Sequence, residues 1–299
     1  MMKRNTRGLM WMGPRGFEQW VPAPKTNADF SSVGSRETDQ YLNGGAGIRG
    51  SKDGHKEYNL AWSAKKREDL APVLDIAKGI YDTGVDSDLV YFIDPTTYDW
   101  NVLPDMLASP YKTGLDGVPL AADLQGYPVY PSLDPGTRNS YGYPARMVTY
   151  ALTQTSRTRS VYIPIPPGKT FWIGVHGSYS GAGVMVTPFG EGTAYGADYP
   201  TPLGVDTDQR VNIYWSSSEN YTGVEVSIGL LPGSSTGQVS LQGIIGQILD
   251  EGVTPFPGGF ISGEGNSGCE FATIPTLSPY MNGKLWGMAA KLVEVGSWQ

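Results

Sequence analysis

The sequence predicts an α+β domain followed by an all-β sandwich, most simply a jelly roll. Charge density falls near the middle of the chain: residues 1–150 hold 16 Lys/Arg and 18 Asp/Glu, whereas residues 151–299 hold 6 and 11. A clear helical periodicity occurs in the first half, while the second half repeatedly alternates apolar and polar residues with period two. We therefore expect a boundary within Thr149–Arg159 and two domains, at residues 1–150 and 151–299.

The clearest helix of the first half is expected at Arg67–Tyr81. Glu68 and Asp69 fall in its first turn, where the helix dipole favours acids, and Pro72 is compatible with the helix only within that turn. A single apolar stripe along this segment consists of Leu70, Val73, Leu74, Ala77 and Tyr81.

Strands are expected on both sides of this helix, at Glu57–Ala64 and Asp88–Pro95. The remaining segments of the first half, residues 1–53 and 94–142, are rich in Gly, Pro, Asn and Asp. Long structureless segments are uncommon inside a compact domain. We therefore expect arms and loops that become ordered against neighbouring subunits.

Four segments of the second half show the alternation of antiparallel strands with one buried and one solvated face. Phe171, Ile173 and Val175 are expected to face the core, and Trp172 and His176 to face solvent. Turns rich in Gly and Pro separate the segments, as in a β-sandwich. The segments are Thr170–Gly177, Arg210–Trp215, Val224–Leu230 and Gln238–Gly243.

Composition excludes several classes of protein. A formal net charge of -7 gives no general attraction for nucleic acid or an anionic membrane. No apolar run approaches the ~20 residues of a membrane span, and no signal peptide is recognisable. The single cysteine excludes an intramolecular disulfide and a cysteine-based zinc cluster. Lys3, Arg4, Arg7 and Arg15 precede the first acid, and form either a solvated arm or one that docks on an acidic neighbour.

The stretch "GEGNSGCEF" (Gly263–Phe271) begins with the spacing of a dinucleotide fingerprint. That fingerprint must close a strand and open a helix, and the prolines that follow, Pro275 and Pro279, exclude the helix. We therefore expect a tight glycine-rich loop, with no cofactor, that leads into a strand. Cys269 and Phe271 are expected to face the sandwich core.

The sequence does not favour an enzyme. Cys269 would need a histidine base, and only His55 and His176 exist, so packing is the simpler role of this thiol. In the stretch Gly177–Gly181, Tyr179 stands where the serine of a nucleophile elbow would be. Asp206 and Asp208 are spaced like Ca²⁺ ligands, but a polar turn is the favoured explanation, so no metal site is expected.

Aromatic and polar residues on the expected solvated surface are the best candidates for binding. Exposed aromatic side chains mark contacts with a glycan or with a protein partner, and the sequence does not separate these two. The candidates are Trp172, His176, Tyr179, Tyr214 and Tyr221.

Three stretches resemble minor tail proteins of long-tailed phages that infect actinobacteria. They are "GLMWMGPRGFEQWVPAP" (Gly8–Pro24), "YFIDPTTYDWNVLPDMLASP" (Tyr91–Pro110) and the C-terminal "SGEGNSGCEF" with "LWGMAAKLVEVGSW". The resemblance spans both halves of the chain. The loops between Pro95 and Gly142 are longer than a minimal ring domain of that family needs.

The implied architecture resembles a distal tail protein: an N-terminal domain of tail-tube type that builds a ring, and a C-terminal sandwich of galectin or carbohydrate-module type. The resemblance implies a non-enzymatic virion component of the tail tip, made in the host cytoplasm, that links the tail tube to the tip. Its partners would be further copies of the chain, in a ring of six or three, together with tail tube, hub and tape measure proteins. The alternative is a glycan-binding adhesion module that contacts the host surface.

Overall fold

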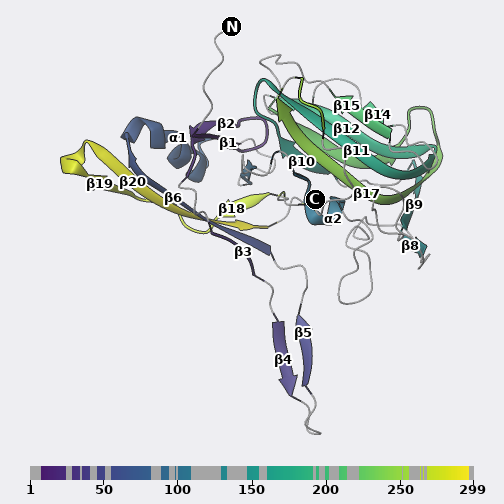
Figure 1. Cartoon of the computed structure of the whole chain (residues 1–299), viewed down its shortest axis with the longest axis horizontal. Helices are drawn as coiled ribbons and strands as arrows, with labels where there is room; N and C mark the ends of the chain where they lie inside the picture. The colour runs from purple at the N-terminus through teal and green to yellow at the C-terminus, as the bar shows by residue number, and fades with distance from the viewer. Residues whose placement is uncertain are drawn as a thin grey trace.

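The computed structural model shows a largely β protein with several antiparallel sheets, in agreement with the β-sandwich character of the predicted fold class. Figure 1 shows two β bodies side by side, with a narrow hairpin that extends away from them. The structure describes residues 8–24, 29–33, 36–40, 46–50, 55–81, 89–93, 98, 100–108, 129–132, 147–154, 160–190, 193–194, 199–201, 209–213, 222–250, 252–255, 263, 265 and 268–295.

The larger body, which we call the sandwich, consists of two five-stranded sheets. One sheet has the order β10-β16-β12-β13, with β14 also paired to β12, and the other has the order β15-β11-β17-β9-β8. The strands of the sandwich are β8 (Val129–Ser132), β9 (Met147–Thr153), β10 (Ser160–Pro164), β11 (Lys169–Ser180), β12 (Ala182–Gly190), β13 (Thr193–Ala194), β14 (Tyr199–Thr201), β15 (Gln209–Ile213), β16 (Gly223–Leu230) and β17 (Thr236–Asp250).

The sandwich core follows the predicted alternation. Phe171, Ile173 and Val175 of β11 are all fully buried in one hydrophobic cluster, which confirms their expected direction. Val184 of β12 and Val226 of β16 join the same cluster from the other sheet. β11, β12 and β16 therefore contribute every second side chain to a core between two sheets.

An irregular segment completes the edge of β17. The amide of Val102 donates to the carbonyl of Gly246 at 2.8 Å, and the amide of Ile248 donates to the carbonyl of Tyr98 at 3.1 Å. The fully buried Asn101 donates to the carbonyl of Ile244 at 2.8 Å and accepts from the amide of Gly246 at 2.9 Å. This side chain supplies the hydrogen bonds that a neighbouring strand would otherwise provide. A short helix, α2 (Asp105–Ala108), follows.

The other body, which we call the terminal body, packs two sheets and a helix around its own hydrophobic cluster. Its sheets have the orders β2-β1-β7 and β18-β20-β6-β3, with β19 also paired to β20. Its elements are β1 (Leu9–Gly13), β2 (Gln19–Pro22), β3 (Asp29–Val33), β6 (His55–Lys65), α1 (Arg67–Ala77), β7 (Tyr91–Phe92), β18 (Cys269–Phe271), β19 (Leu277–Tyr280), η3 (Met281–Gly283) and β20 (Leu285–Glu294).

The predicted helix and its preceding strand are confirmed as α1 and β6, whereas the predicted strand at Asp88–Pro95 is reduced to β7. Leu70 and Val73 are fully buried, but Leu74 only packs partly against the cluster, and Ile76 is buried although the predicted stripe omitted it. Because α1 begins at Arg67, Pro72 lies beyond the first turn, so the expectation that it falls within that turn is wrong. Packing of the buried face offsets the missing backbone bond.

Strand pairing joins residues on both sides of the boundary expected near residue 150. β20 pairs with β6 along most of its length, with Met288 opposite Trp62 and Leu292 opposite Tyr58. These side chains are buried together with Met10 and Leu70 in the cluster of the terminal body. The residues from Cys269 to Glu294 therefore pack against the N-terminal part of the chain rather than within the sandwich.

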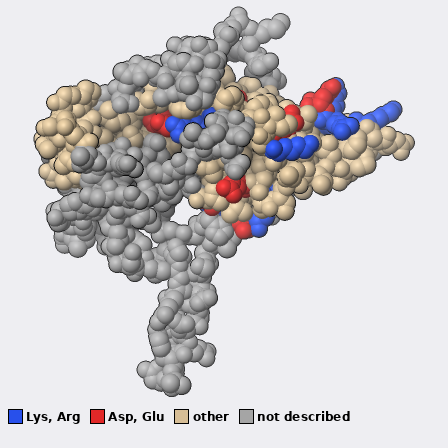
Figure 2. Space-filling model, turned by 180° about the vertical axis from the view of Figure 1, so that it is seen from behind, with Lys and Arg blue, Asp and Glu red and all other residues tan. Residues whose placement is uncertain are grey.

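Figure 2 shows that the charged side chains on that face gather over the end formed by α1 and β20. Lys66 and Glu68 form an exposed ion pair there, and Lys291 of β20 pairs with Glu57 of β6 at 2.9 Å. This distribution matches the higher charge density of the first half of the sequence.

Candidate functional site

The structure changes the interpretation of the predicted binding residues. Trp172 is only 2% exposed and packs with Ile245 and Leu249, so the expectation that it lies on a solvated face is wrong. Its ring lies over Gly174, where a Cβ atom would approach the indole to 2.7 Å. At β11 both faces of the sheet are apolar and covered. A period-two pattern that places tryptophan among the polar positions does not show that the second face is covered.

Of the other four candidates, Tyr179 alone has a described side chain. Tyr179 is partly buried and packs against the sandwich core. His176 lies in β11, but its side chain is outside the described part of the structure, and Tyr214 and Tyr221 lie outside the described residues altogether. Their role in binding stays a prediction.

The glycine-rich stretch at Gly263–Phe271 serves close backbone packing. A Cβ atom at Gly265 would lie 1.8 Å from the carbonyl oxygen of Val102, and the amide of Gly265 donates to the carbonyl of Leu103 at 3.1 Å. Gly268 has a φ of +117°, which favours glycine. The stretch leads into β18, so the strand expected after this loop is confirmed.

Cys269 and Phe271 belong to the terminal body, so the expectation that they face the sandwich core is wrong. The amide of Cys269 donates to the carbonyl of Val90 at 3.0 Å, in a short bridge beside β7. Burial raises the pKa of the Cys269 thiol far above its usual range, with Glu294 adding to the rise. A buried neutral thiol of this kind is a packing residue rather than a nucleophile.

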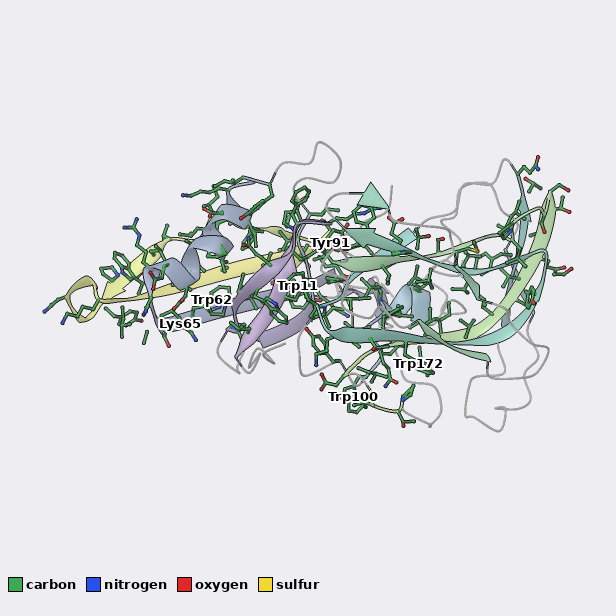
Figure 3. All side chains as sticks on the ribbon, turned by 90° about the horizontal axis from the view of Figure 1, so that it is seen from above. Trp11, Trp62, Lys65, Tyr91, Trp100 and Trp172 are labelled. Atoms are coloured by element: carbon green, nitrogen blue, oxygen red, sulfur yellow. The ribbon has the colours of Figure 1, made fainter. Side chains whose placement is uncertain are left out.

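The β1–β2 turn, which we call the junction loop (Gly13–Glu18), is the clearest polar feature where the two bodies meet. The amide of Phe17 donates to the carbonyl of Pro14 at 2.9 Å and closes the turn. Gly13 must be glycine because a Cβ atom there would lie 2.7 Å from the Cα of Glu18. Figure 3 shows Trp11 and Tyr91 between the terminal body and the sandwich.

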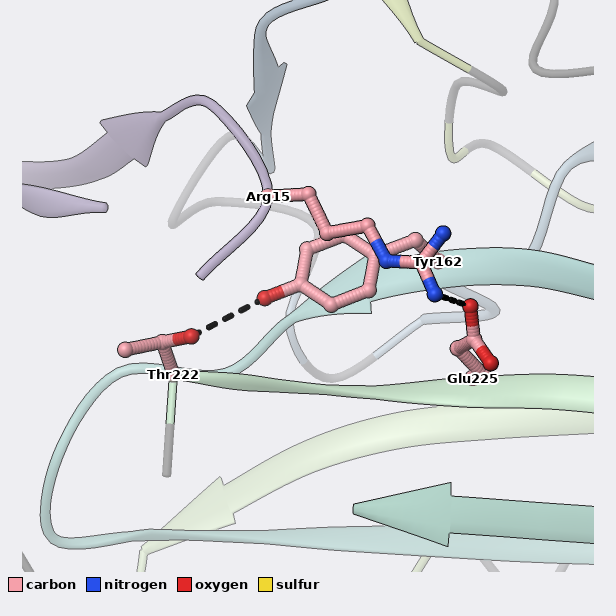
Figure 4. A network of polar contacts seen from close by, with 4 residues as sticks. All are labelled: Arg15, Tyr162, Thr222 and Glu225. Carbon is pink, nitrogen blue, oxygen red and sulfur yellow. Dashed lines mark hydrogen bonds and ion pairs between the residues drawn. The ribbon is translucent and has the colours of Figure 1, made fainter. Parts of the chain in front are cut away.

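Arg15 connects the junction loop to the sandwich. Its guanidinium pairs with the carboxylate of Glu225 on β16, as Figure 4 shows. The same group lies 4.2 Å from the ring centroid of Phe189 and 5.7 Å from that of Tyr162. The ion pair and the aromatic contacts hold one extended side chain across the junction. One of the four early basic residues thus docks on an acid of its own chain, while Lys3, Arg4 and Arg7 lie outside the described residues.

Glu18 lies buried beneath this contact, with 6% exposure. Burial raises the pKa of its carboxyl to about 8, while Tyr162, Thr222 and the backbone of Gly16 partly oppose the rise. Neither carboxyl oxygen makes a hydrogen bond of regular geometry, so these neighbours offset only part of the desolvation. The carboxyl is therefore mostly protonated at neutral pH.

On the sandwich side, the junction loop packs against Tyr162 and Thr222. Their hydroxyl oxygens lie 3.1 Å apart in a hydrogen bond, drawn in Figure 4, and the indole of Trp11 donates to the carbonyl of Thr222 at 3.2 Å. Burial raises the pKa of Tyr162 well above its usual range, with the charge of Glu18 adding to the rise. Gly223 is required here because a Cβ atom would lie 2.3 Å from the Tyr162 hydroxyl.

A second feature is the hairpin arm, formed by β4 (Arg36–Gln40) and β5 (Ala46–Gly50). Within the described sheets these strands pair with each other alone, in register from Arg36 opposite Gly50 to Gln40 opposite Ala46. Figure 1 shows the arm extending away from both bodies. An isolated two-stranded hairpin is marginally stable in water.

No sequence pattern predicts the junction. Residues 15 and 18 lie far along the chain from 162, 222 and 225, and no spacing rule connects them. The only local hint is the turn "GPRGFE", in which glycines surround an arginine just before the first acid.

Two classes of site are absent from the described part of the chain. Within it, no group of three or more His, Cys, Asp or Glu side chains could hold a metal ion. Among the same residues, no helix has the length and apolar character to cross a membrane.

No protein-family model matches the sequence, and no curated protein shows significant similarity to it.

Proposed function

We propose that the protein is a structural component of a phage tail tip, without enzymatic activity, that links the tail tube to the tip. In this proposal the terminal body, together with the hairpin arm, is the tail-tube-like ring and oligomerisation unit. The sandwich is the galectin-like or jelly-roll-like module that the ring displays. The protein would be made in the host cytoplasm and reside in the virion.

The hairpin arm is the observation that carries this proposal. It extends from the protein without any strand of the two larger bodies beside it in the described sheets. Three or more strands, or packing on another element, are needed for a hairpin to be stable alone. A neighbouring copy of the chain supplies such packing in a ring, because each heterologous contact repeats until the ring closes.

The shape of the two bodies supports the same proposal. The terminal body and the sandwich each have their own hydrophobic cluster, and they meet at the junction loop and at a smaller cluster of Leu89, Tyr91, Tyr162 and Phe189. A ring component needs one part that contacts its neighbours and another that projects outward. The tail tube, hub and tape measure proteins are the partners this role requires.

Mass measurement of the purified chain at increasing concentration tests the proposal. We expect discrete assemblies of three or six copies for the wild type, and only monomers after residues 36–50 are replaced by a short Gly–Ser linker. The matched control replaces Asn282, Gly283 and Lys284, the exposed tip of the β19–β20 hairpin, and should assemble like the wild type. A wild type that stays monomeric at every concentration, or a linker variant that assembles equally well, contradicts the proposal.

A second candidate function is adhesion to a host-surface glycan, and one observation favours it. Trp100 is 52% exposed, in the segment that runs beside β17; Figure 3 shows it on the sandwich side of the molecule. An exposed indole is the surface on which a sugar ring stacks. A glycan array that compares the wild type with Trp100→Ala tests this, with Val253→Ala as a control at another exposed apolar residue. Binding lost only in Trp100→Ala supports adhesion, and no binding by the wild type argues against it.

A further inference from the structure

The junction between the two bodies contains a carboxyl group that the proposed function does not use. Glu18 ends the junction loop and is buried between the terminal body and the sandwich, and neither of its oxygens makes a regular hydrogen bond. Around it lie the Tyr162 and Thr222 hydroxyls from the sandwich and the backbone of Gly16 from its own loop. This is a poor environment for a negative charge and a good one for a neutral carboxyl.

The charged groups nearby do not compensate an ionised Glu18. Among the described residues, the titratable or charged groups that surround it are Arg15 of the same loop, Tyr162 of β10 and Glu225 of β16. Arg15 already pairs with Glu225, which is itself an acid. A carboxylate at Glu18 would therefore be an additional buried anion beside one ion pair, and would gain solvation if the loop moved away from the sandwich.

We propose that the junction loop is a proton-controlled latch, which lies closed on the sandwich while Glu18 is protonated and opens when Glu18 ionises. Three contacts hold the loop to the sandwich: the Arg15–Glu225 pair, the Trp11 indole bond to Thr222 and the aromatic contacts of Arg15. All of them sit on the loop that carries Glu18 or on β1 directly before it. The buried cluster of Leu89, Tyr91, Tyr162 and Phe189 also joins the two bodies, so the opening concerns the loop and not the whole terminal body. The inference concerns the junction alone and does not rest on the proposed role in a phage tail.

Pulse-labelling hydrogen exchange on the full chain at pH 6 and pH 9, corrected for intrinsic exchange rates, measures the opening of this junction. The amide of Phe17, which closes the loop on Pro14, and the indole N–H of Trp11, which donates to Thr222 across the junction, report on it. The amides of Gly79 and Lys169, in turns elsewhere, serve as internal controls. A carboxyl with a pKa near 8 when buried and near 4.5 when released favours opening up to about 100-fold more at pH 9 than at pH 6.

Wild-type protection at the Phe17 amide and the Trp11 indole N–H should fall by up to that factor, while the control amides stay unchanged. Glu18→Gln, which keeps the shape of the neutral carboxyl, should show no fall. Glu225→Gln removes the ion pair but leaves Glu18 to titrate, so its junction N–H groups should still respond to pH. A wild type without a pH response, or a Glu18→Gln variant with the wild-type response, overturns the latch.

A direct titration keeps the test decisive if Glu18→Gln does not fold. The carboxyl carbon of Glu18, followed by ¹³C NMR in the wild-type chain, should titrate near pH 8. A midpoint below about pH 5, the range of a solvated glutamate, overturns the latch.

Discussion

The sandwich and the terminal body are both antiparallel β structures, but the chain assembles them differently. In the sandwich, β8 to β17 follow one another within residues 129–250 and pair with strands from the same stretch. In the terminal body, β6 near the N-terminus pairs with β20 near the C-terminus. A destabilising substitution near residue 290 should therefore also destabilise the structure near residue 60. The sandwich should be destabilised by substitutions within its own segment.

The largest effect is expected in the sandwich core. Phe171 is fully buried between the sheets, so Phe171→Ala should cost about 3–5 kcal/mol of unfolding free energy through lost contacts and the cavity left behind. Urea unfolding followed by circular dichroism measures this cost. Thr236→Ala, at an exposed residue of β17, is the control, and a loss below about 1 kcal/mol for Phe171→Ala would contradict the observed core.

A comparable loss of unfolding free energy is expected for a core residue of the terminal body that lies near the C-terminus. Leu292 is fully buried opposite Tyr58, so Leu292→Ala should cost about 2–5 kcal/mol. Ala289→Ser, at an exposed residue of the same strand, should leave stability nearly unchanged. If Leu292→Ala unfolds at the same urea concentration as the control, the C-terminal strand is not part of a shared core.

The contact between the bodies predicts a pH dependence of stability. The pKa of Glu18 is about 8 in the folded chain and about 4.5 when unfolded, so its contribution is fully present below pH 4.5 and is lost as the pH rises toward 8. Wild-type unfolding free energy should fall across this window, by at most a few kcal/mol. The difference between the wild type and Glu18→Gln, measured by urea unfolding at pH 5 and pH 9, isolates this residue. A difference that stays constant from pH 5 to pH 9 would rule out a buried, neutral Glu18.

The smallest effect is expected at the charged end of the terminal body. Lys66 and Glu68 pair at 3.2 Å, but both side chains are more than two-thirds exposed. Lys66→Ala should therefore change stability by less than about 0.5 kcal/mol. Thermal unfolding in low and high salt checks this, and a loss above about 1 kcal/mol would show that the pair does more than a solvated ion pair.

The sequence predicts best where a pattern is local. The alternation in β11 and β16 and the stripe along α1 identified Phe171, Val226 and Leu70 as core residues, because their periods follow directly from strand and helix geometry. Trp172 was misplaced because the alternation assumes one solvated face, whereas β11 is buried on both faces.

Features that depend on distant pairing could not be predicted. Cys269 lies in the second half of the sequence, but β18 pairs with β20, and β20 pairs with β6, so its thiol joins the N-terminal core. The junction of Glu18 with Tyr162 and Thr222 likewise depends on a contact between two bodies. Periodicity within a segment carries no information on which other segment covers it.

Hydrogen exchange in Leu292→Ala tests most directly whether both ends of the chain build one body. We predict faster exchange along β6 and α1, residues 55–77, while β11 and β17 of the sandwich keep wild-type protection. Increased exchange in the sandwich with β6 and α1 unchanged would contradict this account, because β20 would then pack in the sandwich and not in the terminal body.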